Sequence, residues 1–158
     1  MNDLKAIKSV KDGGTLYAME TQHILDKEMD IIDKLLKTGK DVLFMPDSFF
    51  GKGIKFDVIV FKENSYYTAD LKKVNSTNPD TIADAISYGA TQGKNIVADI
   101  NNNIDYRVLA NGLNAAAIDN GKLNSVVLFY KGKTKTYYRN SIISNRFKST
   151  IYNDFIKN

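Results

Sequence analysis

The chain has 158 residues, of which 43% are hydrophobic and 25% are charged, and its formal net charge is +4. This length and mixture predict one globular domain over residues 1–158, and the mild positive charge is compatible with a polyanionic partner. The chain contains no cysteine, which excludes disulfides and thiolate metal sites, and no apolar run long enough to span a membrane.

Hydrophobic periodicity predicts the secondary structure in chain order. The pattern indicates a helix over residues 15–39, strands over 40–46, 55–61 and 66–74, a helix over 78–92, a strand over 95–100, a helix over 106–119, strands over 124–130 and 133–138, and a weakly helical tail over 140–157. This order of elements predicts an α/β fold in which helices flank a mixed β-sheet.

Two of the predicted strands carry an aspartate where an apolar residue is usual. If residues 62–65 form a four-residue hairpin loop, the simplest register places Asp57 directly opposite Asp70. Two carboxylates in that position repel, so the arrangement requires a cation or a shared proton between them. Lys72 follows Asp70 by two residues and therefore lies on the same face of the strand.

The first predicted helix offers a third acid. Glu28 lies near the centre of the apolar stripe of this helix, and Glu20 lies at its edge. A carboxylate in a core-facing stripe needs a partner, because an unpaired buried charge is costly. Glu28 is therefore either a further site residue or one half of a structural ion pair with a lysine.

A helix glutamate, a strand aspartate and the sequence Asp70-Leu71-Lys72 on a hairpin together resemble the PD-(D/E)xK nuclease superfamily. Over residues 20–138, the segments KFDVIV, TADLKKV and TIADAISYGATQGKNIVADI look like the C-terminal nuclease domains of contact-dependent growth-inhibition and other polymorphic toxins. Gln92 falls where these domains often carry a glutamine at a helix end. One departure is Asp70, because glutamate is commoner at that position.

This resemblance implies a restriction-endonuclease-like core and a metal-dependent nuclease, often one that cleaves tRNA. It also implies a toxin that acts in the cytoplasm of a target cell after delivery from another cell. A cognate immunity protein would hold such a toxin in check, and we expect that protein to be small and acidic.

The chemistry of phosphodiester hydrolysis fits these residues. Mg²⁺ or Mn²⁺ would be held by Asp57, Asp70 and the Leu71 carbonyl, with Glu28 as a ligand or acting through a water. Lys72 would orient or deprotonate the attacking water and balance charge in the transition state. Metal-free cleavage of RNA is an alternative, since the 2′-hydroxyl can then be the nucleophile. Chemistry that needs a pair of histidines is excluded, because the chain has a single histidine.

Basic residues near these acids and on the last hairpin are candidates for nucleic-acid contacts. They are Lys52, Lys55, Lys73, Lys94, Lys131, Lys133, Lys135 and Arg139. Lysines on an edge strand also discourage aggregation, and this explains the run over residues 130–139 equally well.

Three functions therefore compete. The first is a toxin nuclease that acts on RNA, and the second is a DNA endonuclease of a phage or mobile element with the same site. The third is a non-catalytic nucleic-acid-binding domain in which the acids are only structural.

Overall fold

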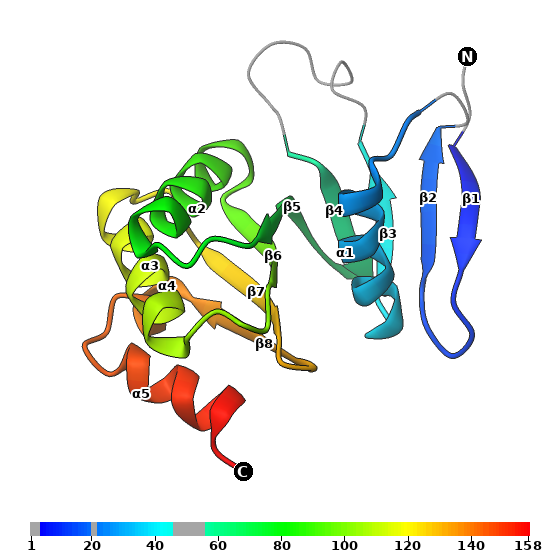
Figure 1. Cartoon of the computed structure of the whole chain (residues 1–158). Coiled ribbons are helices and arrows are strands. Elements are labelled where there is room, and N and C mark those ends of the chain that lie inside the picture. The colour runs from blue at the N-terminus through cyan, green and yellow to red at the C-terminus, as the bar shows by residue number, and fades with distance from the viewer. Residues whose placement is uncertain (1–3, 20–21, 46–55) are drawn as a thin grey trace.

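The computed structural model describes residues 4–19, 22–45 and 56–158 (Figure 1). The described residues form eight strands in one mixed sheet, ordered as in the sequence, with helices on both faces. The strands are β1 (Leu4–Ser9), β2 (Thr15–Met19), β3 (Asp41–Phe44), β4 (Val58–Lys62), β5 (Ser65–Val74), β6 (Asn95–Ile100), β7 (Ser125–Tyr130) and β8 (Lys133–Tyr138). The predicted α/β class with a mixed, helix-flanked sheet is confirmed.

The helices are α1 (Asp26–Lys37), α2 (Pro79–Gly93), α3 (Tyr106–Asp119), α4 (Arg139–Ile142) and α5 (Phe147–Ile151), and a π-helical turn follows at Tyr152–Ile156. The pairs β2–β3, β5–β6 and β6–β7 are parallel, and α1, α2 and α3 respectively make these crossovers. The other neighbouring strands pair antiparallel.

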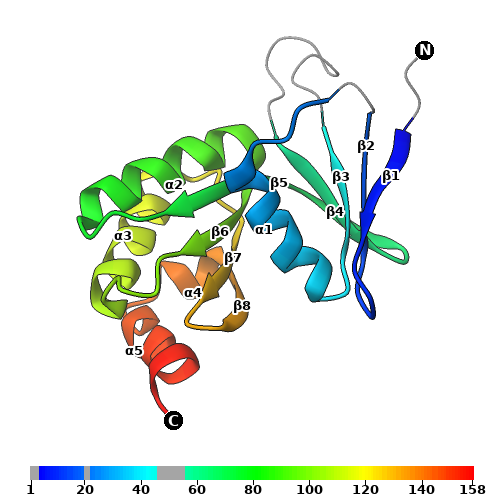
Figure 2. The same cartoon turned by 45° about the vertical axis from the view of Figure 1, so that its right-hand side comes forward.

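The sheet separates two apolar cores. Helix α1 packs on one face, mainly over β2 to β5, and its core includes Ile32, Leu36 and, from β7, Val127. Helices α2 and α3 and the C-terminal helices cover the opposite face of β5 to β8 (Figures 1 and 2). Because strand side chains alternate between faces, each residue of β5 is directed either toward α1 or toward α2.

The first predicted helix is wrong over nearly the first half of its range, at residues 15–19 and 22–25. Residues Thr15–Met19 form strand β2, and the helix begins only at Asp26. Within β2, Leu16 and Ala18 are buried and their neighbours are half-buried, which is the two-residue alternation of a strand. Strand β1 was not predicted, and all its residues are exposed, so no burial pattern marks it in the sequence.

The second and third predicted helices match α2 and α3 to within one residue at each end. Asn78 caps α2 by accepting a hydrogen bond from the Asp80 amide at 2.8 Å, and Pro79 occupies the first helical position. Asp105 caps α3 in the same way through the Arg107 amide, also at 2.8 Å. These local signals fix where both helices begin.

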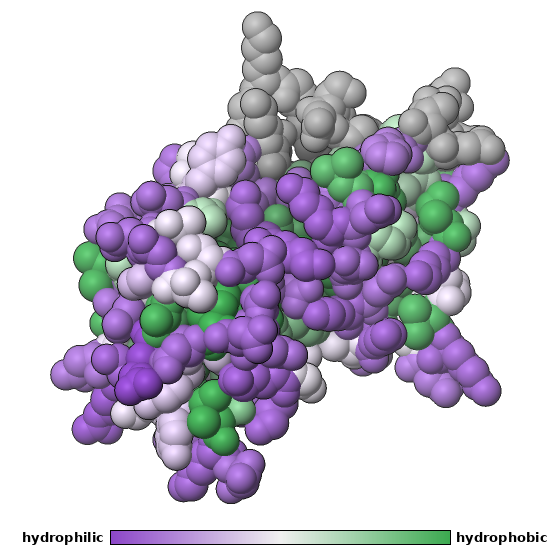
Figure 3. Space-filling view, in the orientation of Figure 1, coloured by the Kyte–Doolittle hydropathy of each residue, from purple (hydrophilic) through white to green (hydrophobic). Residues whose placement is uncertain are grey.

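The surface seen in the view of Figure 1 is mostly hydrophilic, with small separate apolar patches (Figure 3). Across the ranges that the structure describes, we find no helix with the length and apolar character needed to cross a bilayer.

Candidate active site

Strand β5 has two different partners along its length. Its first half pairs antiparallel with β4, ending at Val58–Ala69, and its second half pairs parallel with β6, beginning at Asp70–Ile96. Asp70 therefore lies where β5 passes from one partner to the other. Strand β4 separates from β5 at this point and leaves room for side chains. The candidate site lies there.

The predicted register of the β4–β5 hairpin is confirmed, because Val58 pairs with Ala69 and every further pair keeps the same offset. The loop is tighter than expected, since Lys62 already pairs with Ser65. The direct Asp57–Asp70 pair is not formed, because the strands diverge one residue earlier. The Asp57 amide donates to the Ala69 carbonyl at 3.0 Å instead.

The carboxylate of Asp57 nevertheless turns toward β5. Its Oδ2 accepts a hydrogen bond from the Leu71 amide at 2.8 Å, which holds the side chain beside Asp70. Asp57 is also among the groups that raise the pKa of Asp70, through its charge and through a hydrogen bond between the two side chains. The two acids are therefore neighbours, as predicted, but a side-chain hydrogen bond of Asp57 brings them together and not direct strand pairing.

Asp70 is almost fully buried, with 5% of its surface exposed. Burial first, and the nearby Asp57 second, raise the pKa of Asp70 to about 7, and Lys72 acts against this rise. The Lys72 Nζ lies 3.2 Å from Oδ2 of Asp70. This contact is an ion pair, and no donor among the described residues meets hydrogen-bond geometry at this buried oxygen.

Helix α2 presses closely on this part of β5, and two glycines permit it. A Cβ at Gly89 would lie 2.9 Å from Oδ2 of Asp70 and 3.0 Å from Cε of Lys72. A Cβ at Gly93 would lie 2.8 Å from the backbone nitrogen of Asp70. Sequence reasoning missed both glycines, although the spacing GATQG at a helix end signals close packing on a strand.

A cavity of about 280 Å³ brings the predicted residues together. Glu28, Asp57, Asp70, Leu71 and Lys72 all line it, from α1, the segment before β4, and β5. An adjoining cavity of about 390 Å³ shares Glu28 and Asp57 with it.

Glu28 reaches this cavity from the first turn of α1. Its Oε1 accepts a hydrogen bond from the Leu25 amide at 3.0 Å, so the side chain also caps its own helix. Glu28 is only half-buried, although its spacing predicted a place near the centre of the apolar stripe, because it lies in the first turn of α1, before the buried Ile31 and Ile32. From this position Glu28 can contact a ligand in the cavity and also cap its own helix.

The donor set suits a hard cation. Asp57 and Asp70 supply carboxylate oxygens, the Leu71 carbonyl is adjacent, and Oδ2 of Asp70, which has an ion pair with Lys72 but no hydrogen bond among the described residues, can accept a further ligand. Within the described ranges, however, no three His, Cys, Asp or Glu side chains are grouped closely enough to hold a metal ion. The two aspartates therefore fit a cation that keeps several waters, as Mg²⁺ does.

Two residues near the predicted set hold Lys72 and the strand ends in place, and both were missed in the sequence. The Lys72 Nζ lies 5.2 Å from the centroid of the Tyr88 ring on α2. The Asn95 side chain donates to the Thr68 carbonyl at 3.0 Å, which ties the start of β6 to β5. Tyr88 is one residue before Gly89, and no sequence signal distinguished it.

Several other predicted residues lie elsewhere. Glu20, Lys52 and Lys55 fall outside the described residues. Gln92 is half-buried near the end of α2 and does not line the cavity. Lys73 does line it, and its Nζ is paired with Asp30 of α1 at 3.0 Å.

The remaining basic residues are separate from the cavity. Lys94 is exposed and follows α2 with a φ of 62°. Lys131 donates from its amide and its ammonium to Asn102, and the half-buried Arg139 donates to the Asn120 and Leu123 carbonyls. Lys133 and Lys135 are exposed on β8, which ends the sheet, so both explanations of this lysine run stay open.

Comparisons with family models, with curated proteins and with solved structures gave no match.

Proposed function

We propose that this protein is a metal-dependent nuclease with a restriction-endonuclease-like core. One observation carries the proposal: Asp57, Asp70 and Lys72 converge with Glu28 on one cavity, where a buried carboxylate oxygen has no hydrogen bond from any described residue. Groups with strongly perturbed pKa values in a cavity are candidates for function.

A purely structural role accounts poorly for the two aspartates. Burial raises the pKa of Asp70 to about 7, which means that the ionised form is destabilised where it stands. An apolar residue at position 70 would avoid that cost, and buried ion pairs are often replaceable by apolar residues without loss of stability. Because Asp70 is present despite this unfavourable burial, a ligand that binds to the two acids explains it better than a structural role does.

The residues that would hold Mg²⁺ or Mn²⁺ are Asp57, Asp70 and the carbonyl of Leu71. When bound, such a cation neutralises charge on the phosphoryl oxygens and lowers the pKa of a water. Glu28 stands outside the close aspartate pair, so we assign it to a water in the cavity and not to the metal directly.

Lys72 has the position to act on the reacting groups. Its Nζ lies 3.2 Å from Asp70, its side chain is a quarter exposed, and the Tyr88 ring and the backbone of α2 limit its movement. From there the ammonium would hold the attacking water by a hydrogen bond and stabilise the negative charge of the transition state. A residue placed in this way contributes through preorganisation, because its geometry exists before the substrate binds.

We infer that the substrate is RNA, with tRNA the first to test, on the strength of the resemblance to toxin nuclease domains. On the same basis we propose action in the cytoplasm of a target cell and restraint by a small acidic immunity protein. Expression of the wild-type chain alone in a neutral host tests this toxin role. Healthy growth with a good yield of folded protein would contradict it.

Cleavage by the purified chain is the decisive experiment. Total tRNA and plasmid DNA are offered in parallel, each with Mg²⁺, with Mn²⁺ and with EDTA. We expect metal-dependent cleavage of tRNA, and we expect Asp70→Asn to abolish it. Cleavage of plasmid DNA alone would favour the DNA endonuclease, and binding of nucleic acid without any cleavage would favour the non-catalytic domain.

A further inference from the structure

A groove lies between the last turn of α1 and the strands β7 and β8, away from the carboxylate cavity. It consists of two cavities of about 460 and 430 Å³ that share Thr38, Phe129 and Thr134 in their walls. We call it the α1–β8 groove. Its floor is the face of β7 and β8 that α1 leaves uncovered, and one of its walls is the C-terminal end of α1.

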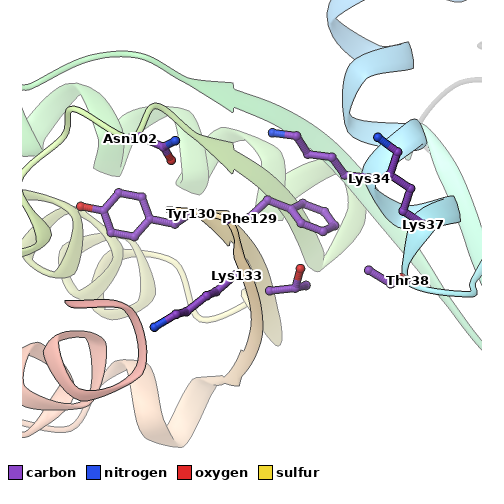
Figure 4. Close-up of a pocket in the computed structure, with 9 residues that line it drawn as sticks. Lys34, Lys37, Thr38, Asn102, Phe129, Tyr130 and Lys133 are labelled. Carbon is purple, nitrogen blue, oxygen red and sulfur yellow. The ribbon is translucent and has the colours of Figure 1, made fainter. Parts of the chain in front are cut away.

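The α1–β8 groove is positively charged. Four lysines line it, Lys34, Lys37, Lys40 and Lys133, and none of the described residues in its walls is acidic. Lys37, Lys40 and Lys133 make no ion pair with any residue in the described part of the chain. Figure 4 shows Lys34 and Lys37, both from α1, on one side of the first cavity, and Lys133, from β8, on the other.

Aromatic rings lie at the second cavity of the groove. Tyr66 and Tyr138 are 74% and 63% exposed, and both line this cavity. Tyr67 lies beside Tyr138: burial and the proximity of Tyr138 raise the pKa of Tyr67 to about 12. Exposed rings of this size gain nothing from the core, so their flat faces remain available for stacking.

Amide groups complete the lining. Asn95 Oδ1 accepts hydrogen bonds from Asn124 Nδ2 at 2.9 Å and from Ser125 Oγ at 2.7 Å, which fixes these polar groups at the edge of the second cavity. The exposed amide of Asn124 can still donate to and accept from the edges of bases, whereas Asn95 uses its polar atoms within the protein.

We propose that the α1–β8 groove binds a single-stranded segment of RNA. Lysines without acidic neighbours bind phosphates, and exposed tyrosines stack on unpaired bases. A duplex would use the lysines but not the tyrosines, because its base faces are already stacked. An acidic protein could pair with the lysines and pack on the tyrosines as well, and the oligonucleotide titration below separates it from RNA.

The groove connects to the carboxylate cavity through charged side chains. Lys34, in the groove wall, is paired with Asp99 of β6 at 2.6 Å. Asp99 lies opposite Lys73 in the β5–β6 pairing, and Lys73 lines the carboxylate cavity. Binding of RNA in the groove does not depend on the proposed function. The further step, that the bound RNA strand is also the strand that is cut, rests on the proposed function.

The test measures binding in EDTA, where metal-dependent cleavage is absent. A fluorescein-labelled decauridylate is titrated with the full chain by fluorescence anisotropy at several salt concentrations. Two variants probe the groove, Lys37→Gln/Lys40→Gln and Tyr66→Ser/Tyr138→Ser. Lys148→Gln/Lys157→Gln, exposed on the C-terminal segment, is the control with the same change of charge. Urea melts check that each variant is folded.

We expect the Lys37/Lys40 variant to bind more weakly and to lower the slope of log K against log salt by about 1.4, since each phosphate contact on a single strand contributes about 0.7. The tyrosine variant should bind at least about fivefold more weakly with an unchanged slope, because base stacking contributes without charge. The control should bind as the wild type does.

Equal weakening by the control variant, or tight binding of an RNA duplex that ignores the tyrosine change, would overturn the inference. So would a wild-type chain that binds an acidic protein by these residues and no decauridylate. A chain that binds the oligonucleotide through the groove and cuts nothing would leave this inference standing while the proposed function fails.

Discussion

The two ends of helix α1 face surfaces of opposite chemistry. At its N-terminal end, Glu28 joins two aspartates and one lysine in a cavity where a carboxylate is almost fully buried. At its C-terminal end, Lys37 and Lys40 line a groove whose walls contain no acidic side chain among the described residues. The buried carboxylate of the first region lowers the stability of the fold, whereas the exposed lysines of the second region have little effect on it. Variants in the first region should therefore change turnover, and variants in the second should change binding.

The largest expected effect is that of Lys72→Met on turnover. The change keeps the apolar stem and removes the ammonium, so cleavage should fall by roughly 10²–10⁴-fold, the usual contribution of a general acid or base. The measurement is the cleavage rate at saturating Mg²⁺, paired with a urea melt.

Folding of this variant should change little, because Asp70 can accept a proton in place of its lost cation. Lys148→Met, at an exposed position remote from the cavity, is the matched control and should keep full activity. An active and stable Lys72→Met protein would show that the assignment of Lys72 is wrong.

The next effect is that of Asp70→Asn on stability without metal. The pKa of Asp70 is raised from 3.8 to about 7 in the folded chain, so the folded state holds the proton more tightly than the unfolded state. The stabilisation from this protonation is full below about pH 4 and is lost as pH rises through 7. In EDTA, Asp70→Asn should therefore be more stable than wild type at pH 8, by up to about 4 kcal/mol, and similar at pH 4.

Urea melts of both proteins across this pH range make the measurement. Saturating Mg²⁺ should narrow the gap at pH 8 by stabilising the wild type only, since a ligand that binds only the folded state raises its stability. If the free energies of unfolding of the two proteins changed in parallel with pH, the pKa of Asp70 would not be raised in the folded state.

The sequence was sufficient for the part of this site that depends on local pairing. The alternation along two adjacent strands and the short loop between them placed Asp57 near Asp70, and that register is present. Lys72 followed from the two-residue repeat, and Glu28 from the three-to-four-residue repeat of α1. Each of these inferences used a spacing of a few residues.

The parts that sequence reasoning missed depend on distant contacts. The exchange of β4 for β6 along β5 involves strands distant in the sequence, and Gly89 and Gly93 let α2 approach β5 closely at that point. Strand β1 has no buried residue, so nothing in its sequence distinguishes it from a loop. The α1–β8 groove collects residues from four strands, and no short motif marks such a surface.

A smaller effect is expected from Gly89→Ala. The added Cβ would meet Oδ2 of Asp70 at 2.9 Å and Cδ1 of Ile96 at 2.7 Å, so these side chains or α2 must shift. Overpacking of this kind typically costs about 1–3 kcal/mol. The same displacement should shift Asp70 and Lys72, and cleavage should fall even where the variant is fully folded.

Gly112→Ala is the matched control for this prediction. Its Cβ would meet Cγ2 of Ile82 at 2.7 Å, in the core between α3 and α2 and away from the cavity. Comparable destabilisation of both variants, with cleavage lost only in Gly89→Ala, would locate the effect in the site. Equal activity of the two would show that the close approach of α2 is not needed for turnover.

The smallest effect concerns the ion pair between Lys73 and Asp30, which lies between the two regions. The pair is exposed, and exposed pairs contribute little to stability, so neither Lys73→Gln nor Asp30→Asn should shift the midpoint of a urea melt measurably.

The effects of these two substitutions on oligonucleotide binding should have opposite signs. Lys73→Gln removes a cation that Asp30 partly neutralises, so it should weaken binding and lower the salt slope by less than the roughly 0.7 of a full phosphate contact. Asp30→Asn frees the same cation for a phosphate and should tighten binding. If both substitutions instead weaken binding equally, the pair acts as a structural unit, and the two ends of α1 serve separate ligands.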